Sequence, residues 1–282
     1  MRNDFCIFIL THGRPNRQQT YDLLKKLNYK GKLYLIVDDQ DESIEEYKNK
    51  YNEIVIVFNK EKAIAETDTM DNLNYTNSVV FARNESFNIA RRLGIKYFLM
   101  LDDDYISINY KFDDKNLYIS KATKNINKII KHTLDYYISS NALTISFSQG
   151  GDFIGGGNGT FEKSIFLKRK AMNSFFCSTE RPLKFTGRIN EDVNMYCLYG
   201  STGRIIFQIP QISITQNDTQ QNAGGLTDIY LKIGTYIKSF YSVMCCPSFV
   251  KIAMMNSENT RIHHNVIWEN ACAKIISEKH VK

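Results

Sequence analysis

The stretch "KYFLMLDDDYISI", residues 96–108, runs five apolar residues directly into three aspartates, Asp102 to Asp104. The apolar run has the length and composition of a buried β-strand, and apolar residues return after the aspartates. Adjacent carboxylates repel one another, and burying an unpaired carboxylate costs several kcal/mol. The stretch therefore predicts a strand that ends at a site where a positive group balances the aspartates.

Short apolar strands alternate with helices through the first hundred residues. Strands are predicted at 5–10, 33–37, 54–58 and 96–101, and helices at 15–27, 43–51 and 78–93. This alternation is typical of βαβ units, so it predicts an α/β fold with a mostly parallel central sheet flanked by helices.

Beyond the aspartates the pattern continues and then loosens. A helix is predicted at 122–140, a strand at 142–147, a glycine-rich loop at 149–160, a helix at 190–200, a strand at 204–209 and a helix at 226–244. Gly234 weakens the last helix. We expect the C-terminal part to pack on the same sheet. No linker or repeat interrupts the chain, which favours a single domain over 1–282.

Composition limits the class of protein. With 43% hydrophobic and 23% charged residues the chain is that of an ordinary globular protein, and no apolar run is long enough to cross a membrane. The first apolar run, 5–10, lacks a basic leader, so we expect a strand rather than a signal peptide. The six cysteines form no C-x-x-C pair, which favours reduced thiols in a cytoplasmic protein. The net charge of +6 suits a polyanionic partner.

Three predicted strands deliver polar residues to one edge of the sheet. Thr11 to Arg14 follow the first strand, Asp38 and Asp39 the second, and Asp102 to Asp104 the fourth. Ligands of open α/β sheets bind at the carboxyl ends of the strands, so we expect a ligand site here. Asp102 and Asp104 are two residues apart and suit Mg²⁺ or Mn²⁺. The alternative is a solvated acidic turn.

Three further positions suit the same site, each with a structural alternative. Arg83 near a helix start suits a phosphate, or is an ordinary surface arginine. Glu191 and Asp192 begin another helix, where one of them could deprotonate an acceptor hydroxyl, or both could simply complement the helix dipole. On a strand, only one of His263 and His264 would point inward, as a metal ligand or as a structural histidine.

Four segments in order make the chain resemble the TET-associated glycosyltransferase family of bacteriophages, which has the GT-A fold. They are "FARNESFNIARRLGIKYFLMLDDDY", "GRINEDVNMY", "TQQNAGGLTDIYLKIGTYIKSFYSVMCCPSFVKI" and "RIHHNVIW". The resemblance implies a nucleotide-sugar-binding half at 1–110 and an acceptor and catalytic half at 111–282. It also implies attachment of sugars to hydroxymethylated pyrimidines in phage DNA, in the cytoplasm of the host cell.

The resemblance further implies the role of each site residue. Those for the nucleotide sugar are Thr11, Arg14, Asp39, Arg83, Asp102, Asp103 and Gly156. Those for Mn²⁺ or Mg²⁺ are Asp104 and Asp102 with either His263 or His264. Those for catalysis are Asp192 as the base and Glu191 in support. Those on the acceptor side are Gln216, Gln220, Tyr236 and Lys238.

The resulting prediction is metal-dependent transfer from a nucleotide sugar, with UDP-glucose as the default donor. The acceptor is 5-hydroxymethylcytosine or 5-hydroxymethyluracil, and the sequence does not choose between them. One positioned base predicts inversion, whereas retention follows if Asp192 is a substrate clamp. The alternatives are a glycan, lipid or protein acceptor, an inactive nucleic-acid-binding relative, and a two-metal nuclease or polymerase. The oligomeric state stays open.

Overall fold

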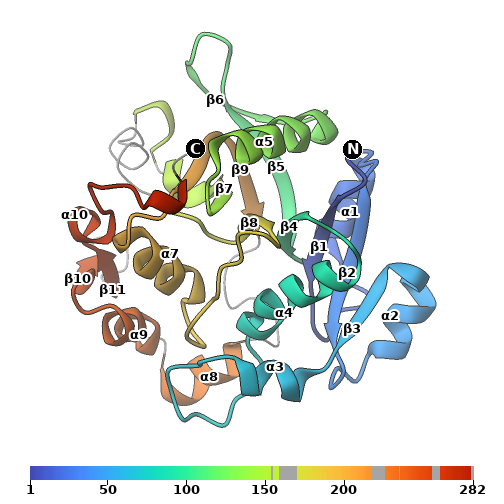
Figure 1. The fold of residues 1–282 in the computed structure, drawn as a ribbon, viewed down its shortest axis with the longest axis horizontal. Coiled ribbons are helices and arrows are strands. Elements are labelled where there is room, and N and C mark those ends of the chain that lie inside the picture. The colour runs from blue at the N-terminus through green and yellow to red at the C-terminus, as the bar shows by residue number, and fades with distance from the viewer. Residues whose placement is uncertain (154, 159–169, 217–225, 235, 256–260, 281–282) are drawn as a thin grey trace.

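The computed structural model describes residues 1–153, 155–158, 170–216, 226–234, 236–255 and 261–280. Within these residues a nine-stranded sheet has the order β3-β2-β1-β4-β8-β7-β9-β5-β6 (Figure 1). Its strands are β1 Phe5–Leu10, β2 Lys32–Asp38, β3 Val55–Phe58, β4 Tyr97–Asp102, β5 Tyr105–Phe112, β6 Tyr118–Ala122, β7 Thr144–Gln149, β8 Ser174–Ser178 and β9 Ile206–Gln216.

Helices flank this sheet. They are α1 Gln19–Lys26, α2 Ile44–Tyr51, α3 Lys60–Glu66, α4 Val79–Arg92, α5 Ile126–Ser140, α7 Glu191–Ser201, α8 Thr227–Ile233, α9 Ile237–Cys245 and α10 Trp268–Ala271. Short 3₁₀ turns occupy Asn52–Ile54, Gly150–Phe153, Gly156–Asn158 and Glu278–His280. In the described part of the chain, no helix has the length and apolarity that a membrane span requires.

The predicted α/β fold with a central sheet flanked by helices is confirmed. β1 pairs in parallel with β2 and β4, and β2 pairs in parallel with β3. Beyond β4 the sheet is mixed, because β8 is antiparallel to both β4 and β7, and β5 is antiparallel to β6 and β9. The four N-terminal strands are therefore all parallel, as the alternation of strands and helices predicted, and β7 and β9 form a further parallel pair.

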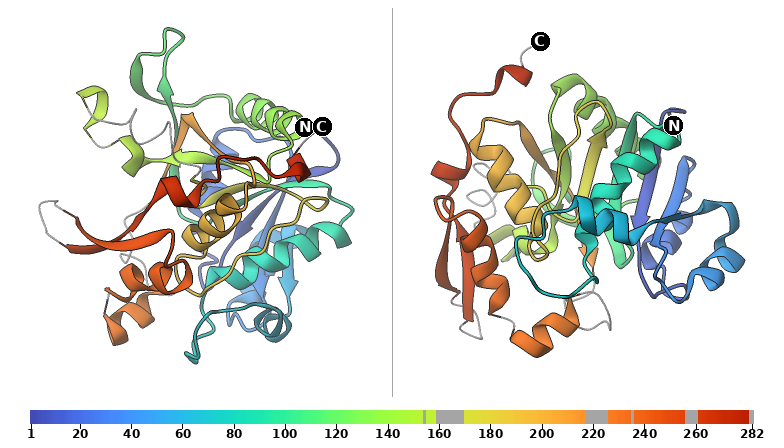
Figure 2. Two further views of the ribbon diagram at one scale, coloured as in Figure 1. Left: turned by 60° about the vertical axis from the view of Figure 1, so that its left-hand side comes forward. Right: turned by 60° about the horizontal axis from the view of Figure 1, so that its bottom comes forward.

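The N-terminal strands are buried on both faces, which explains their continuous apolar runs. Along β1, Phe8 and Leu10 pack into the core under α3, α4 and α7, whereas Ile7 and Ile9 pack into the core under α1, α2 and α5. β4 alternates in the same way, with Met100 on the α4 side. Figure 2 shows the helices on both sides of the strands.

Several predicted elements differ from the observed ones. The first helix begins at Gln19 rather than at Pro15, and strands β5 and β6 had no counterpart in the prediction. The helix predicted at 226–244 breaks into α8 and α9 at Gly234, which has φ +95°. A Cβ at that glycine would lie 2.7 Å from the Tyr236 ring.

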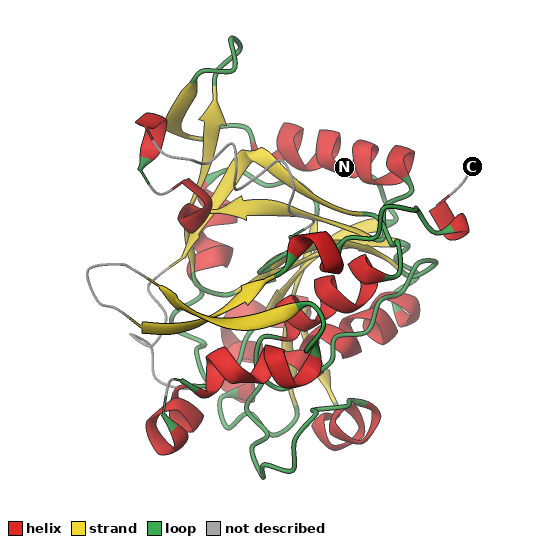
Figure 3. Ribbon diagram, turned by 90° about the vertical axis from the view of Figure 1, so that its left-hand side faces the viewer, coloured by secondary structure: helices red, strands yellow, loops and turns green. Residues whose placement is uncertain are grey.

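The C-terminal part contributes to two sheets rather than one. β9 joins the main sheet and runs to Gln216, beyond its predicted end at 209. Strands β10 Val250–Met255 and β11 Arg261–Val266 form a separate antiparallel hairpin (Figure 3). The side-chain hydroxyl of Ser239 on α9 donates to the carbonyl of Ile262, so α9 holds this hairpin.

Candidate active site

A cavity of about 700 Å³ lies at the carboxyl ends of β1, β2 and β4. The convergence of polar groups expected from the strand ends is present: Thr11, Arg14, Asp38 and the three aspartates of the opening stretch all line the cavity. The start of α7, one residue of α9 and the histidines of β11 line it as well.

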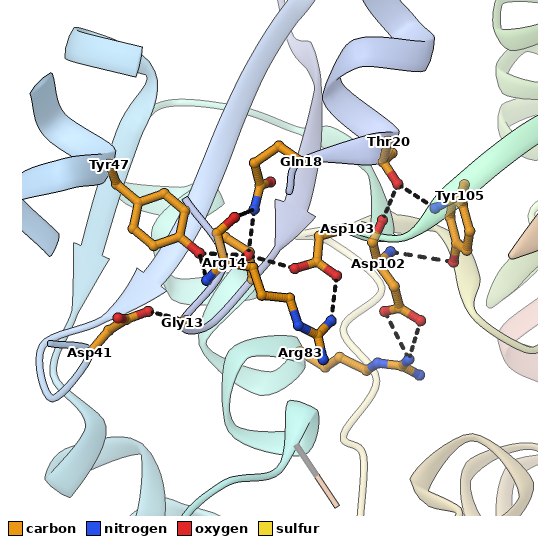
Figure 4. A network of polar contacts seen from close by, with 11 residues as sticks. Gly13, Arg14, Gln18, Thr20, Asp41, Tyr47, Arg83, Asp102, Asp103 and Tyr105 are labelled. Atoms are coloured by element: carbon orange, nitrogen blue, oxygen red, sulfur yellow. Dashed lines mark hydrogen bonds and ion pairs between the residues drawn. The ribbon is translucent and has the colours of Figure 1, made fainter. Parts of the chain in front are cut away.

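The three adjacent aspartates differ in their surroundings, and Figure 4 shows the separate partners of Asp102 and Asp103. Asp103 accepts hydrogen bonds from Thr11 Oγ1 at 2.6 Å and from Arg14 Nη1 at 2.9 Å. Asp102 pairs with Arg83 Nη2 at 3.2 Å. Asp104 differs, because its buried Oδ1 has no hydrogen-bond partner among the described residues. Burial, then the charges of Asp102 and Asp103, raise the pKa of Asp104 to about 7. Arginines therefore balance two of the three charges.

Arg83 is a buried residue that pairs with two carboxylates, not an ordinary surface arginine. It is 2% exposed and lies between Asp102 and Glu191, with its Nη1 3.0 Å from Glu191 Oε1. The rings of Phe175 and Phe185 lie 4.9 and 5.5 Å from its guanidinium carbon. Burial raises the pKa of Glu191, although the charge of Arg83 opposes this shift.

Glu191 and Asp192 form the first turn of α7, and both are buried in the cavity wall. Asn190, in the left-handed conformation with φ 53°, precedes them. Its side-chain amide donates to the carbonyl of Lys238 at 2.6 Å and to Ser242 Oγ at 3.0 Å. The loop before α7 is thus fastened to α9, which fixes the position of Asp192 in the cavity.

One end of the cavity holds a cluster that the sequence prediction did not assign. The Asp38 carboxylate lies 2.7 Å from His12 Nδ1 and 3.1 Å from Lys60 Nζ, and Lys60 is 4% exposed. Asp39, the predicted nucleoside contact, is exposed and is not among the cavity-lining residues. It accepts from Asn59 Nδ2 and from the backbone N–H of Lys60. Successive residues of β2 face opposite sides of the sheet, which places Asp38, rather than Asp39, on the face covered by α4. This alternation could have identified Asp38 as the site residue from the sequence.

Both predicted histidines line the cavity, and their ring centroids are 4.3 Å apart. The Nδ1 atom of His264 is buried without a partner in the described structure. Burial, His263, Lys238 and Lys170 lower the pKa of His264 to about 4, so its ring is neutral at pH 7. The described residues assemble no group of three His, Cys, Asp or Glu side chains that could by itself hold a metal ion.

The predicted acceptor residues separate into two groups. Gln216, which accepts from Asn173 Nδ2 at 2.9 Å, and Lys238 line the cavity. Tyr236 is 58% exposed and is not among the lining residues. Gln220 lies outside the described residues. Gly156, predicted to approach the sugar, sits at φ +56° beside Tyr118 and does not line the cavity.

A second pair that the sequence prediction did not assign lies in the cavity wall. Lys170 Nζ is 2.8 Å from Asp152 Oδ1, and Gln208 Nε2 donates to the other carboxylate oxygen at 2.7 Å. Asp152 and Lys170 both line the cavity. Asp152 stands inside the glycine-rich segment, but its partner is 18 residues away, so spacing alone did not connect them.

The chain belongs to the TET-associated glycosyltransferase family, whose family model matches residues 5–225. The suspected family is thereby confirmed, and the protein is a glycosyltransferase. Membership in a glycosyltransferase family argues against the nuclease and polymerase alternatives.

Comparison with solved structures finds many similar chains of low identity, among them the following two. Glucosyl-3-phosphoglycerate synthase from Mycobacterium tuberculosis, in complex with Mg²⁺ and UDP, is 10% identical with a TM-score of 0.47, covering 93% of this chain and 87% of that one. A mannosyltransferase from Pyrobaculum calidifontis, in complex with GDP-Man and Mn²⁺, is 9% identical with a TM-score of 0.46, covering 77% and 57%. No curated protein matches the sequence.

Proposed function

We propose that the cavity binds a nucleotide sugar and a divalent cation, and that it transfers the sugar to a hydroxymethylated pyrimidine of phage DNA. The observation that supports this most is Asp104, a half-buried carboxylate in the cavity wall whose buried Oδ1 has no hydrogen-bond partner among the described residues. A lone buried carboxylate is costly unless a cation neutralises it.

The residues of the cavity could supply part of a divalent-cation site. Asp104 Oδ1 and His264 Nδ1 are both buried without partners in the described structure, and Asp102 lines the same cavity. The described side chains do not form a complete ligand set, so the diphosphate of the donor would have to complete the coordination. Such oxygen and imidazole ligands suit Mn²⁺, and the carboxylates also suit Mg²⁺. When bound, the cation would neutralise the charge that develops on the departing diphosphate. His263 is the alternative to His264 as the histidine ligand.

The donor nucleoside would occupy the end formed by His12, Asp38 and Lys60. Asp38 can accept from a base or ribose while Lys60 donates beside it, as uridine requires. Asp39 would act indirectly, by accepting a hydrogen bond from the backbone N–H of Lys60 and so positioning that residue. Thr11 and Asp103 would hold Arg14 in the cavity wall for the diphosphate, since both contact the same buried network. UDP-glucose is the donor that we propose.

Asp192 would act as the general base. It would take the proton from the hydroxymethyl oxygen as that oxygen bonds to the anomeric carbon, while the bond from that carbon to the diphosphate breaks. Attack opposite the leaving group inverts the anomeric centre. Glu191, held by Arg83, would fix the helix turn that carries the base. Gln216 and Lys238 would border the acceptor.

The test combines the purified chain, Mn²⁺, a panel of nucleotide sugars and DNA that contains 5-hydroxymethylcytosine or 5-hydroxymethyluracil. Nucleosides from digested DNA are read by mass spectrometry. We expect a hexose increment that disappears with EDTA and falls at least 10³-fold in Asp104→Ala and Asp192→Asn, on the order of the loss when a catalytic group is removed. The matched control is Asp114→Asn, at an exposed aspartate of the loop between β5 and β6.

Two outcomes would overturn parts of the proposal. Hydrolysis of the nucleotide sugar without transfer to DNA would keep the donor site and move the acceptor to a glycan or protein. Absence of nucleotide-sugar binding would overturn the donor assignment.

A further inference from the structure

Three C-terminal elements, α9, β10 and β11, carry basic residues and no acidic ones. α9, β10 and β11 contain Lys238, Lys251, Arg261 and two histidines, without one aspartate or glutamate. Elsewhere in the cavity wall each lysine or arginine is paired with a carboxylate; these residues are Arg14, Lys60, Arg83 and Lys170. Lys238 lines the same cavity, and none of the described carboxylates forms an ion pair with it.

The register of the hairpin places its basic residues on one face. Lys251 pairs with Asn265, and Ala253 pairs with His263. Paired residues and alternate residues of a strand share a face, so Lys251 and Arg261 lie on the face of His263 and Asn265. His263 and Asn265 line the cavity, as do His264 and Val266 of the other face, so both faces of β11 border it; Lys251 and Arg261 are exposed on the face of His263 and Asn265. Basic groups therefore continue from the cavity along the hairpin, which stands apart from the main sheet in Figure 3.

Lys238 places a positive charge in the cavity wall beside the hairpin. An anion placed there would be stabilised without breaking an existing ion pair of Lys238.

We propose that Lys238, Lys251 and Arg261, which we call the basic track, bind phosphates of the DNA strand that carries the acceptor base. The inference rests on the proposed function, because it names how the acceptor of that site is held. Alternate residues on one face of a strand are about 7 Å apart, so neighbouring positions can reach different phosphates of an extended strand. Lysine and arginine contacts to phosphates position a nucleic acid without reading its sequence.

The test is equilibrium binding of a fluorescently labelled oligonucleotide of unmodified DNA, measured by anisotropy over a series of NaCl concentrations. The variant Lys251→Glu/Arg261→Glu is compared with Lys124→Glu/Lys128→Glu, which changes net charge equally at exposed positions at and before the start of α5. We expect the hairpin variant to bind about tenfold or more weakly, with a salt slope smaller by about two. The α5 control should bind within about twofold of wild type, and UDP-glucose binding should be unchanged in both.

Three other results would each contradict a part of this proposal. Equal weakening in both double variants would overturn the basic track, because net charge alone would then explain binding. Binding of UDP-glucose without any binding of the oligonucleotide would overturn both the track and the DNA acceptor, while the donor site stands. Tighter binding of heparin than of DNA, lost in the same variant, would overturn the nucleic-acid assignment. If the charge reversal fails to fold by circular dichroism, Lys251→Gln/Arg261→Gln repeats the comparison.

Discussion

The two sides of the cavity balance their charges differently. Of the aspartates that line the cavity at the ends of β2 and β4, Asp38, Asp102 and Asp103 each have a lysine or arginine partner, whereas Asp104 has none among the described residues. On the side of α9 and β11, Lys238 faces the cavity with no acidic residue in either element. Paired charges hold their side chains in place before a ligand arrives, whereas an unpaired charge gains its partner from the ligand. The side proposed to bind the donor is therefore preformed, and the side proposed to bind the acceptor would be completed by an anion.

Among the predictions, we expect Arg83→Met to have the largest effect on stability. The substitution keeps much of the volume but leaves Asp102 and Glu191 buried without their shared cation. Removing one partner of a buried ion pair costs about 3–5 kcal/mol, so we expect a loss of this size in the free energy of unfolding. Urea unfolding followed by Trp268 fluorescence measures it. Arg91→Met, at an exposed arginine of the same helix, is the control.

An unchanged unfolding midpoint in Arg83→Met would show that the pair contributes nothing net. The double variant Arg83→Met/Glu191→Gln sharpens the result. It removes one of the two orphaned carboxylates, so it should recover part of the lost stability.

Asp103→Asn tests whether the middle aspartate acts through Arg14. The amide keeps the shape of the side chain but loses the charge that pairs with Arg14 Nη1. Hydrogen bonds to charged groups contribute about 1.5–3 kcal/mol, so we expect the KM for the nucleotide sugar to rise about tenfold or more. kcat at saturating donor should change less, because the group does not touch the reacting atoms. A loss confined to kcat would instead place Asp103 among the catalytic groups. Asp22→Asn on α1 is the exposed control.

The pH dependence of the metal-free protein tests Asp104. Its pKa is about 7 in the folded chain, against an ordinary value of 3.8. Between these values the folded state binds more protons than the unfolded state, so stability falls as pH rises from about 4 to 7 and then levels off. Asp104→Asn should flatten this fall, which thermal unfolding of both proteins across the window measures. Mn²⁺ should stabilise wild type most above pH 7, where the carboxylate is ionised, and should leave the variant nearly unaffected. Parallel curves for the two proteins would contradict the assignment.

The same contrast explains what could be predicted from sequence. The donor side lies at strand ends, and the rule that polar residues after parallel strands meet at one edge brought Thr11, Arg14 and Asp102 to Asp104 together. The ion pairs were not predictable, because Asp38 with Lys60 and Asp152 with Lys170 depend on packing between distant segments.

The acceptor side was harder to predict for a related reason. A two-stranded hairpin and a helix broken at Gly234 are set by tertiary contacts such as that of Ser239 with Ile262. Apolar residues keep their helical spacing on both sides of Gly234, so the sequence predicted one helix at 226–244.

The smallest expected effects separate two residues that the family resemblance assigned together to the acceptor. Lys238 and Tyr236 are two positions apart on or beside α9, so they point to nearly opposite sides of the helix. Lys238 lines the cavity, and Tyr236 is 58% exposed outside its lining. We expect Lys238→Met to raise the KM for modified DNA about fivefold, and Lys238→Arg to restore it, because a phosphate contact needs the charge. Tyr236→Ala should stay within about twofold, as is usual for an exposed side chain. A larger loss in Tyr236→Ala than in Lys238→Met would move the DNA strand to the outer face of α9 and away from the basic track.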